Sequence, residues 1–132
     1  MNSIQENISI LIVEDDSDLR VVYGEIFSRE PFHVVGEAAN GQEGVDLYQS
    51  LKPDITICDI EMPIMNGLDA LKAIMALNPD ACVIMLTSLK VHLLWDSCLI
   101  AGATHYIRKE DSIDAIRSNV LESWREHQRA RR

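Results

Sequence analysis

Apolar residues are grouped along this chain in two alternating ways. Short runs of strand length occur five times, at 8–13, 32–36, 55–58, 82–86 and 104–107. After each run, apolar side chains recur every three or four residues, which is the spacing of one helix face. These stretches predict helices at about 17–29, 40–51, 67–77, 91–102 and 111–128. The chain therefore alternates strand and helix in strict order.

Such an alternation indicates a parallel sheet with helices on both faces. Strands that are apolar almost throughout fit this arrangement, because helices cover both sides of the sheet. With right-handed crossovers, five strands usually adopt a flavodoxin-like order, 2-1-3-4-5, or a half-Rossmann order. We predict an α/β, flavodoxin-like (βα)5 fold in which the first and third strands are neighbours.

Capping residues set the expected helix ends. Asp16 or Ser17 can cap the first helix, and Asp111 opens the last one. Asn40 and Glu43 make a capping-box-like pair at the second helix. The apolar stripes expected to face the core include Val22, Ile26, Leu71, Ile74, Leu99, Ile113 and Val120.

Acidic residues stand at the C-terminal ends of two predicted strands. Glu14 and Asp15 follow the first strand, and Asp59 follows the third. In an open α/β sheet this edge is where ligands bind. Clustered carboxylates repel one another unless a cation neutralises them, and Mg²⁺ prefers oxygen ligands. We therefore predict a Mg²⁺ site of Asp15 and Asp59, with Glu14 binding directly or through a water and the Glu61 backbone carbonyl completing it.

Two more polar side chains end the neighbouring strands. Thr87 closes the fourth strand, and Lys109 follows the fifth. A carboxylate nucleophile, a metal, a lysine and a hydroxyl together make a phosphoryl-transfer site. Asp59 would form an aspartyl phosphate, while the metal and Lys109 balance charge on the transferred oxygens.

Four segments together carry a family resemblance. They are Glu14-Asp15, the segment 59–67 that reads DIEMPIMNG, Leu86-Thr87-Ser88, and the segment 102–109 that reads GATHYIRK. In this order and spacing the chain resembles the receiver domain of two-component response regulators over nearly its whole length. The resemblance implies that Asp59 accepts a phosphoryl group from the phosphohistidine of a histidine kinase or phosphotransfer protein.

The resemblance also implies roles for the residues around Asp59. Asp15 would ligate Mg²⁺ together with Asp59, and Glu14 would lie in the outer shell. Lys109 would bind the phosphoryl oxygens, and Thr87 would hydrogen-bond to them.

The resemblance further implies a switch. Thr87 would move toward the phosphoryl group, and Tyr106 would be the aromatic residue that changes rotamer. The surface of the fourth helix, fifth strand and last helix would then repack to bind an output protein or a second copy of the chain. Glu110 departs from the family pattern, because proline is common there; a cis Lys109–Glu110 bond is therefore doubtful.

Two apolar residues of the fourth helix leave an alternative open. Leu93 and Ile100 lie off the stripe of that helix. They are either exposed, which would mark a partner or dimer surface, or more deeply buried.

Composition bounds the remaining possibilities. The chain has 132 residues and is 47% hydrophobic, which suits one domain over 1–132, with a core at about 7–122 and a basic helix end at about 123–132. The net charge is −9, but it is −12 before residue 117 and +3 from there on. An acidic body argues against nucleic acid as the main partner. The arginines at the end either contact an anionic surface or form a solvated helix end.

The expected location is the cytoplasm. No apolar stretch approaches the ~18 residues needed to cross a bilayer, and residues 1–7 lack the features of a signal peptide. Cys58, Cys82 and Cys98 lie in apolar contexts without metal-ligand spacing, as expected for buried thiols in a reducing compartment.

Two other functions remain as alternatives. One is a pseudo-receiver that binds a partner without phosphorylation. The other is a metal-dependent hydrolase or nuclease that uses Glu14 with Asp59 and Glu61. We expect a phosphoacceptor without multiple turnover rather than an enzyme. The chain is either a stand-alone receiver or part of a longer regulator.

Overall fold

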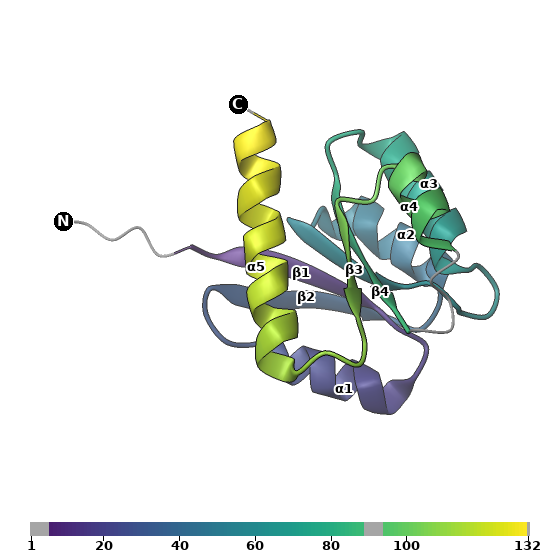
Figure 1. Ribbon diagram of the computed structural model, residues 1–132. Helices are drawn as coiled ribbons and strands as arrows, with labels where there is room; N and C mark the ends of the chain where they lie inside the picture. The colour runs from purple at the N-terminus through teal and green to yellow at the C-terminus, as the bar shows by residue number, and fades with distance from the viewer. Residues whose placement is uncertain (1–5, 89–93, 132) are drawn as a thin grey trace.

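The computed structural model describes residues 6–88 and 94–131, in which a parallel sheet lies between two layers of helices (Figure 1). The strands are β1 (Ile8–Val13), β2 (Phe32–Ala38), β3 (Ile55–Asp59), β4 (Cys82–Thr87) and β5 (His105–Arg108). The sheet has five strands in the order β2-β1-β3-β4-β5. The predicted flavodoxin-like fold is therefore confirmed, and the half-Rossmann order is excluded.

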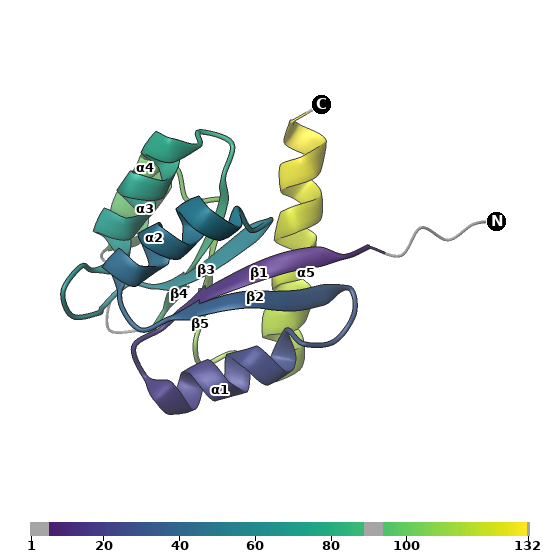
Figure 2. The same ribbon diagram turned by 180° about the vertical axis from the view of Figure 1, so that it is seen from behind.

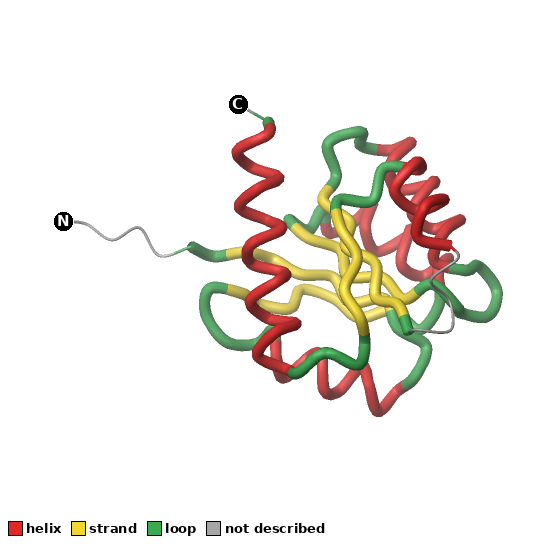
Figure 3. Tube along the Cα trace, viewed as in Figure 1, coloured by secondary structure: helices red, strands yellow, loops and turns green. Residues whose placement is uncertain are grey.

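The helices divide into a pair and a trio around this sheet (Figures 2 and 3). They are α1 (Ser17–Ile26), α2 (Gly41–Leu51), α3 (Gly67–Leu77), α4 (Trp95–Ala101) and α5 (Ile113–Ala130). α1 and α5 pack on one face, in a cluster that includes Phe27 and Val120. α2, α3 and α4 pack on the other face, in a cluster that includes Leu71 and Cys98.

Most of the predicted caps are present. The Asp16 side chain accepts hydrogen bonds from the backbone N–H groups of Asp18 (2.9 Å) and Leu19 (3.2 Å). Asn40 accepts from the Glu43 backbone at 2.9 Å, and Glu43 accepts from the Ala39 backbone at 3.2 Å, which gives the predicted capping-box-like pair.

Two helix ends differ from the sequence prediction. α1 ends at Ile26 rather than near Arg29, and α5 is capped by Ser112 instead of Asp111. The Ser112 side chain accepts a hydrogen bond from the Ala115 backbone at 3.1 Å. A capping residue needs extended backbone beside the first helical turn, and the turn after β5 places Ser112 in that conformation.

Three apolar residues predicted to face the core are instead exposed. The exposed fractions are 38% for Val22, 44% for Leu99 and 55% for Ile113. Helical spacing gives the direction of a stripe, but it does not give how far the sheet extends beneath each helix. Ile100 is 87% exposed, so of the two alternatives for this residue, exposure and deeper burial, exposure is confirmed. Leu93 lies outside the described residues.

The cysteines behave as predicted for core residues. Cys58, Cys82 and Cys98 are free and buried. Burial raises the pKa of Cys82 to about 11, so this thiol stays protonated at neutral pH. Within residues 6–88 and 94–131, no helix has the length and apolar character required to cross a membrane.

Strand register explains where the polar side chains meet. Val13 of β1 pairs with Cys58 of β3, and Asp59 pairs with Leu86 of β4. These strands therefore reach the same edge of the sheet at their C-terminal ends, where the loops carrying the candidate residues begin.

Candidate functional site

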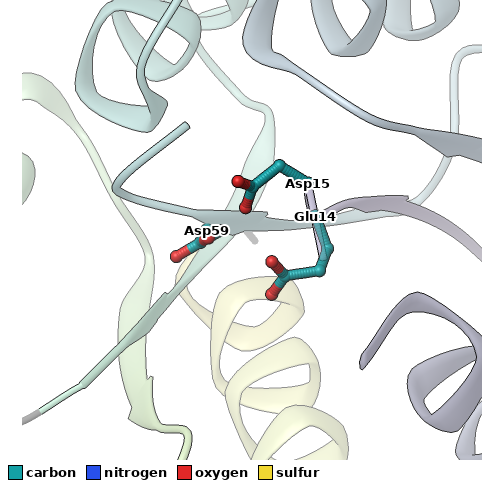
Figure 4. A group of neighbouring side chains, drawn as sticks. All are labelled: Glu14, Asp15 and Asp59. Atoms are coloured by element: carbon teal, nitrogen blue, oxygen red, sulfur yellow. The ribbon is translucent and has the colours of Figure 1, made fainter. Parts of the chain in front are cut away.

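Three carboxylates converge at the C-terminal edge of the sheet (Figure 4). Glu14 and Asp15 directly follow β1, and Asp59 is the last residue of β3. One oxygen from each carboxylate lies within 4.8 Å of the others. Glu14 and Asp59 are buried, with exposed fractions of 0% and 5%, whereas Asp15 is exposed. This oxygen donor set could hold a metal ion, and one open side would let further ligands reach it.

Lys109 completes the cluster from the loop after β5. Its Nζ lies 3.0 Å from an oxygen of Glu14 and 3.0 Å from an oxygen of Asp59. The Lys109 backbone N–H donates to the Thr87 carbonyl at 2.8 Å, which fixes the start of this loop against β4. The structure thus brings Lys109 together with all three carboxylates predicted from the sequence.

The cluster holds more negative charge than its one lysine balances. Burial and, second, the nearby charge of Asp59 raise the pKa of Glu14 to about 7, against the opposing effect of Lys109. Burial also raises the pKa of Asp59, again against Lys109. Burial lowers the pKa of Lys109, but the two carboxylates outweigh this and the net shift is upward. A bound cation would relieve this excess charge, so the residues present fit a divalent metal.

The β1–α1 loop is held by an arginine that sequence reasoning missed. Arg20 Nη1 donates to the Glu14 carbonyl at 2.7 Å and lies 3.4 Å from the Asp15 carbonyl. The Asp16 backbone N–H also donates to the Glu14 side chain at 3.2 Å. These contacts fix the backbone that carries the acidic pair. Helical spacing places Arg20 one turn into α1, but spacing alone does not show that its side chain turns back to the loop.

The loop after Asp59 packs closely against the strand end. A Cβ at Gly67 would lie 1.9 Å from the Asp59 carbonyl oxygen, so only glycine fits there. The Gly67 N–H donates to the Ile60 carbonyl at 2.7 Å. The Asn66 side chain accepts from the Asp69 backbone at 2.9 Å and so caps α3. The Glu61 side chain is exposed and lies outside the carboxylate cluster; the role of its backbone carbonyl as a ligand stays a prediction.

Thr87 and Tyr106 lie on the two strands beside this cluster. Thr87 is fully buried, and its hydroxyl donates to the Ser88 carbonyl at 3.1 Å. Tyr106 pairs with Met85 across the sheet and is half-buried. The Lys109–Glu110 bond is trans, since Glu30–Pro31 is the cis bond of the described residues.

Comparisons with known proteins agree with this geometry. Residues 10–121 match the sequence model of the response regulator receiver domain. The chemotaxis protein CheY of Thermotoga maritima is 40% identical over 100 residues, which cover 76% of this chain and 83% of that protein. The fold and these matches define a receiver domain of two-component systems. The chain belongs to the response regulator receiver domain family.

Solved structures extend the similarity. The response regulator domain of Thermotoga maritima CheB aligns with a TM-score of 0.80 at 35% identity, over 91% of this chain and 95% of that one. A chain of the CheX-CheY-BeF3-Mg complex of Borrelia burgdorferi aligns with a TM-score of 0.77 at 35% identity, over 88% of this chain and 85% of that one.

Proposed function

We propose that this protein is a phosphoacceptor that receives a phosphoryl group on Asp59 from a histidine kinase or phosphotransfer protein. The observation that supports this most directly is the position of Lys109 Nζ, 3.0 Å from both Glu14 and Asp59 in a cluster of three carboxylates. A structural ion pair would need one carboxylate, whereas this arrangement leaves negative charge uncompensated beside a nucleophile.

In the proposed reaction an oxygen of Asp59 attacks the phosphorus of a phosphohistidine. The new O–P bond forms as the P–N bond breaks, and the histidine nitrogen leaves with the electron pair. Lys109 then pairs with the phosphoryl oxygens in place of one carboxylate contact. Thr87 rotates its hydroxyl from the Ser88 carbonyl toward the same oxygens.

Mg²⁺ is the metal that best fits the oxygen donor set. Asp15 and Asp59 would bind it, Glu14 would hold it directly or through a water, and the Glu61 carbonyl would complete the protein ligands. When bound, it supplies positive charge for the transferred oxygens. The similar solved CheX-CheY complex from Borrelia burgdorferi contains BeF3 and Mg²⁺, which supports this choice.

The proposed output is a change in a protein-binding surface. α4, β5 and α5 form this surface, and the exposed Leu99 and Ile100 of α4 add apolar area to it. An output protein, an output domain in the same polypeptide or a second copy of the chain would bind there. We also propose that the protein acts in the cytoplasm, makes no direct contact with nucleic acid and hydrolyses only its own aspartyl phosphate.

The test is intact-protein mass spectrometry after incubation with Mg²⁺ and a small acyl-phosphate donor. A gain of one phosphoryl group is expected, with no gain in EDTA or in Asp59→Asn. Absence of a gain in folded wild-type protein would contradict the proposal. That outcome would favour a pseudo-receiver that binds its partner without phosphorylation.

A further inference from the structure

An aromatic stack joins α4 to β5 beside the phosphoacceptor edge. The rings of Trp95 and Tyr106 are 3.9 Å apart between centroids and inclined by 23°. Trp95 is the first residue of α4, and Tyr106 is the second residue of β5. Both rings are half-buried and pack against the core cluster beneath α2, α3 and α4.

Charged and aromatic neighbours extend the stack on both sides. The guanidinium carbon of Arg108 lies 5.9 Å from the Trp95 ring centroid, within the range of a cation–π contact. The His105 ring lies 5.4 Å from the Tyr106 ring at 30°. The Trp95 ring therefore has a cation as well as the phenol ring to hold it, and the Tyr106 ring is covered by the first residue of a neighbouring helix.

Strand pairing connects this stack to Thr87. Met85 and Thr87 of β4 pair with Tyr106 and Arg108 of β5. Tyr106 thus stands two residues from the position opposite Thr87. Movement of its ring toward the strand end would separate it from Trp95, because the two rings are now in direct contact, with their centroids 3.9 Å apart. Stacked aromatic pairs shift an equilibrium by roughly two- to tenfold beyond their burial.

We propose that Trp95 is a positioning residue that holds the Tyr106 ring against α4. It thereby sets the fraction of unmodified molecules in which this ring already has the position that it takes after phosphorylation. The inference rests on the proposed function, since it concerns the switch that Asp59 would control. Trp95 restrains the unmodified protein. Phosphorylation must overcome the free energy of this stack. A weaker stack therefore lowers the free-energy difference that phosphorylation has to supply in order to shift the equilibrium.

The experiment follows the Tyr106 ring itself. Protein labelled with 3-fluorotyrosine has three tyrosines, and comparison with Tyr106→Phe identifies the resonance of Tyr106 in the ¹⁹F NMR spectrum. The labelled protein is titrated with beryllofluoride in the presence of Mg²⁺, as a mimic of the phosphoryl group. The variants are Trp95→Leu, which removes the stack, and Trp95→Phe, which keeps an aromatic ring.

We expect two effects in Trp95→Leu. The Tyr106 resonance of the unliganded protein lies nearer to its position at saturation, and the half-saturating concentration of beryllofluoride falls by roughly two- to tenfold. Trp95→Phe restores most of the wild-type behaviour. Val21→Ala is the control, because this residue is 61% exposed on α1, on the opposite face of the sheet from α4, and should change neither quantity.

An unchanged Tyr106 resonance and an unchanged half-saturating concentration in both Trp95 variants would overturn the inference. A higher beryllofluoride requirement in Trp95→Leu would also overturn it. If Trp95→Leu does not fold, Trp95→Phe decides, since it must show an intermediate shift. Intact-mass data on the wild type separate the two proposals: wild-type protein that is phosphorylated without any shift of Tyr106 would contradict this inference alone.

Discussion

Two aspartates at opposite ends of β3 differ in almost every physical respect. Asp54 precedes the strand, is exposed, and accepts hydrogen bonds from the Ser9 backbone N–H at 2.9 Å and the Ser9 hydroxyl at 3.1 Å. The Asp54 N–H donates back to the Ser9 hydroxyl at 2.8 Å. Asp59 ends the strand, is 5% exposed, and faces Glu14, Asp15 and Lys109.

The difference separates a structural carboxylate from a reactive one. Asp54 joins β1 to the start of β3 through neutral partners, so its charge stays partly in water. Asp59 shares the half-buried Lys109 with a second, buried carboxylate, Glu14, and burial raises the pKa of Asp59. Uncompensated charge of this kind costs stability and persists where chemistry requires it.

The largest expected effect is the loss of stability when the cation shared by Glu14 and Asp59 is removed. Lys109→Ala leaves Glu14 and Asp59 without their common partner. We expect a loss of about 2–3 kcal/mol in the free energy of unfolding at pH 7 without metal. Arg125→Ala is the control, because Arg125 pairs with Glu6 at 2.7 Å on the surface and should cost below about 1 kcal/mol. Urea unfolding measures both, and equal losses would contradict this view of the cluster.

A neutral side chain at position 14 should have the opposite effect and raise the free energy of unfolding. The pKa of Glu14 is raised from 4.5 to about 7, so the folded protein binds this proton more tightly than the unfolded chain does. The resulting stability is present at low pH and is lost as the pH rises from 4.5 to about 7.

Glu14→Gln should therefore stabilise the metal-free protein by on the order of 1–3 kcal/mol at pH 8 and by much less at pH 5. Thermal unfolding at both values of pH checks this. A gain that does not depend on pH would show that the proton on Glu14 is not its cause.

Mg²⁺ should stabilise the wild type by relieving the same charge. At ten times its dissociation constant, a ligand that binds only the folded state adds about 1.4 kcal/mol. Calorimetric melting with and without Mg²⁺ should show the increase, and Asp15→Asn should remove most of it. Asp54→Asn should retain the full response, and loss of the response in that variant would break the distinction between the two ends of β3.

The smallest effect is expected at the start of β3, where Asp54 contacts Ser9. Ser9→Ala removes both side-chain hydrogen bonds with Asp54 and should cost about 1 kcal/mol. Phosphoryl uptake should be unchanged, because the contact lies at the opposite end of the strand. A slower uptake measured by intact mass would show that the two ends are coupled.

The sequence predicted those elements whose boundaries depend on local chemistry. α2 begins after the predicted Asn40 cap, and α3 spans Gly67–Leu77 as its apolar spacing predicted. The alternation and the right-handed crossover rule reduced the strand orders to two, and the predicted flavodoxin-like order, which brings Glu14 and Asp59 to one edge, is the one observed. These predictions needed no knowledge of side-chain rotamers.

Other features depend on contacts that the sequence does not display. Whether Val22 and Ile113 are covered depends on how far the sheet extends under α1 and α5. The Arg20 contact with the Glu14 carbonyl and the Trp95–Tyr106 stack depend on rotamers and on the placement of one element against another. The spacing of apolar residues along α4 carries no information about β5, so it could not predict this stack.

The most direct test of the central claim locates the phosphoryl group on the chain. Protein treated with Mg²⁺ and an acyl-phosphate donor is reduced with borohydride, which converts an aspartyl phosphate to homoserine, and its peptides are sequenced by mass spectrometry. Homoserine at position 59, with aspartate retained at positions 15 and 54, is the predicted result. Homoserine at another position, or at none in protein that had gained the phosphoryl mass, would contradict the assignment of Asp59 as the phosphoacceptor.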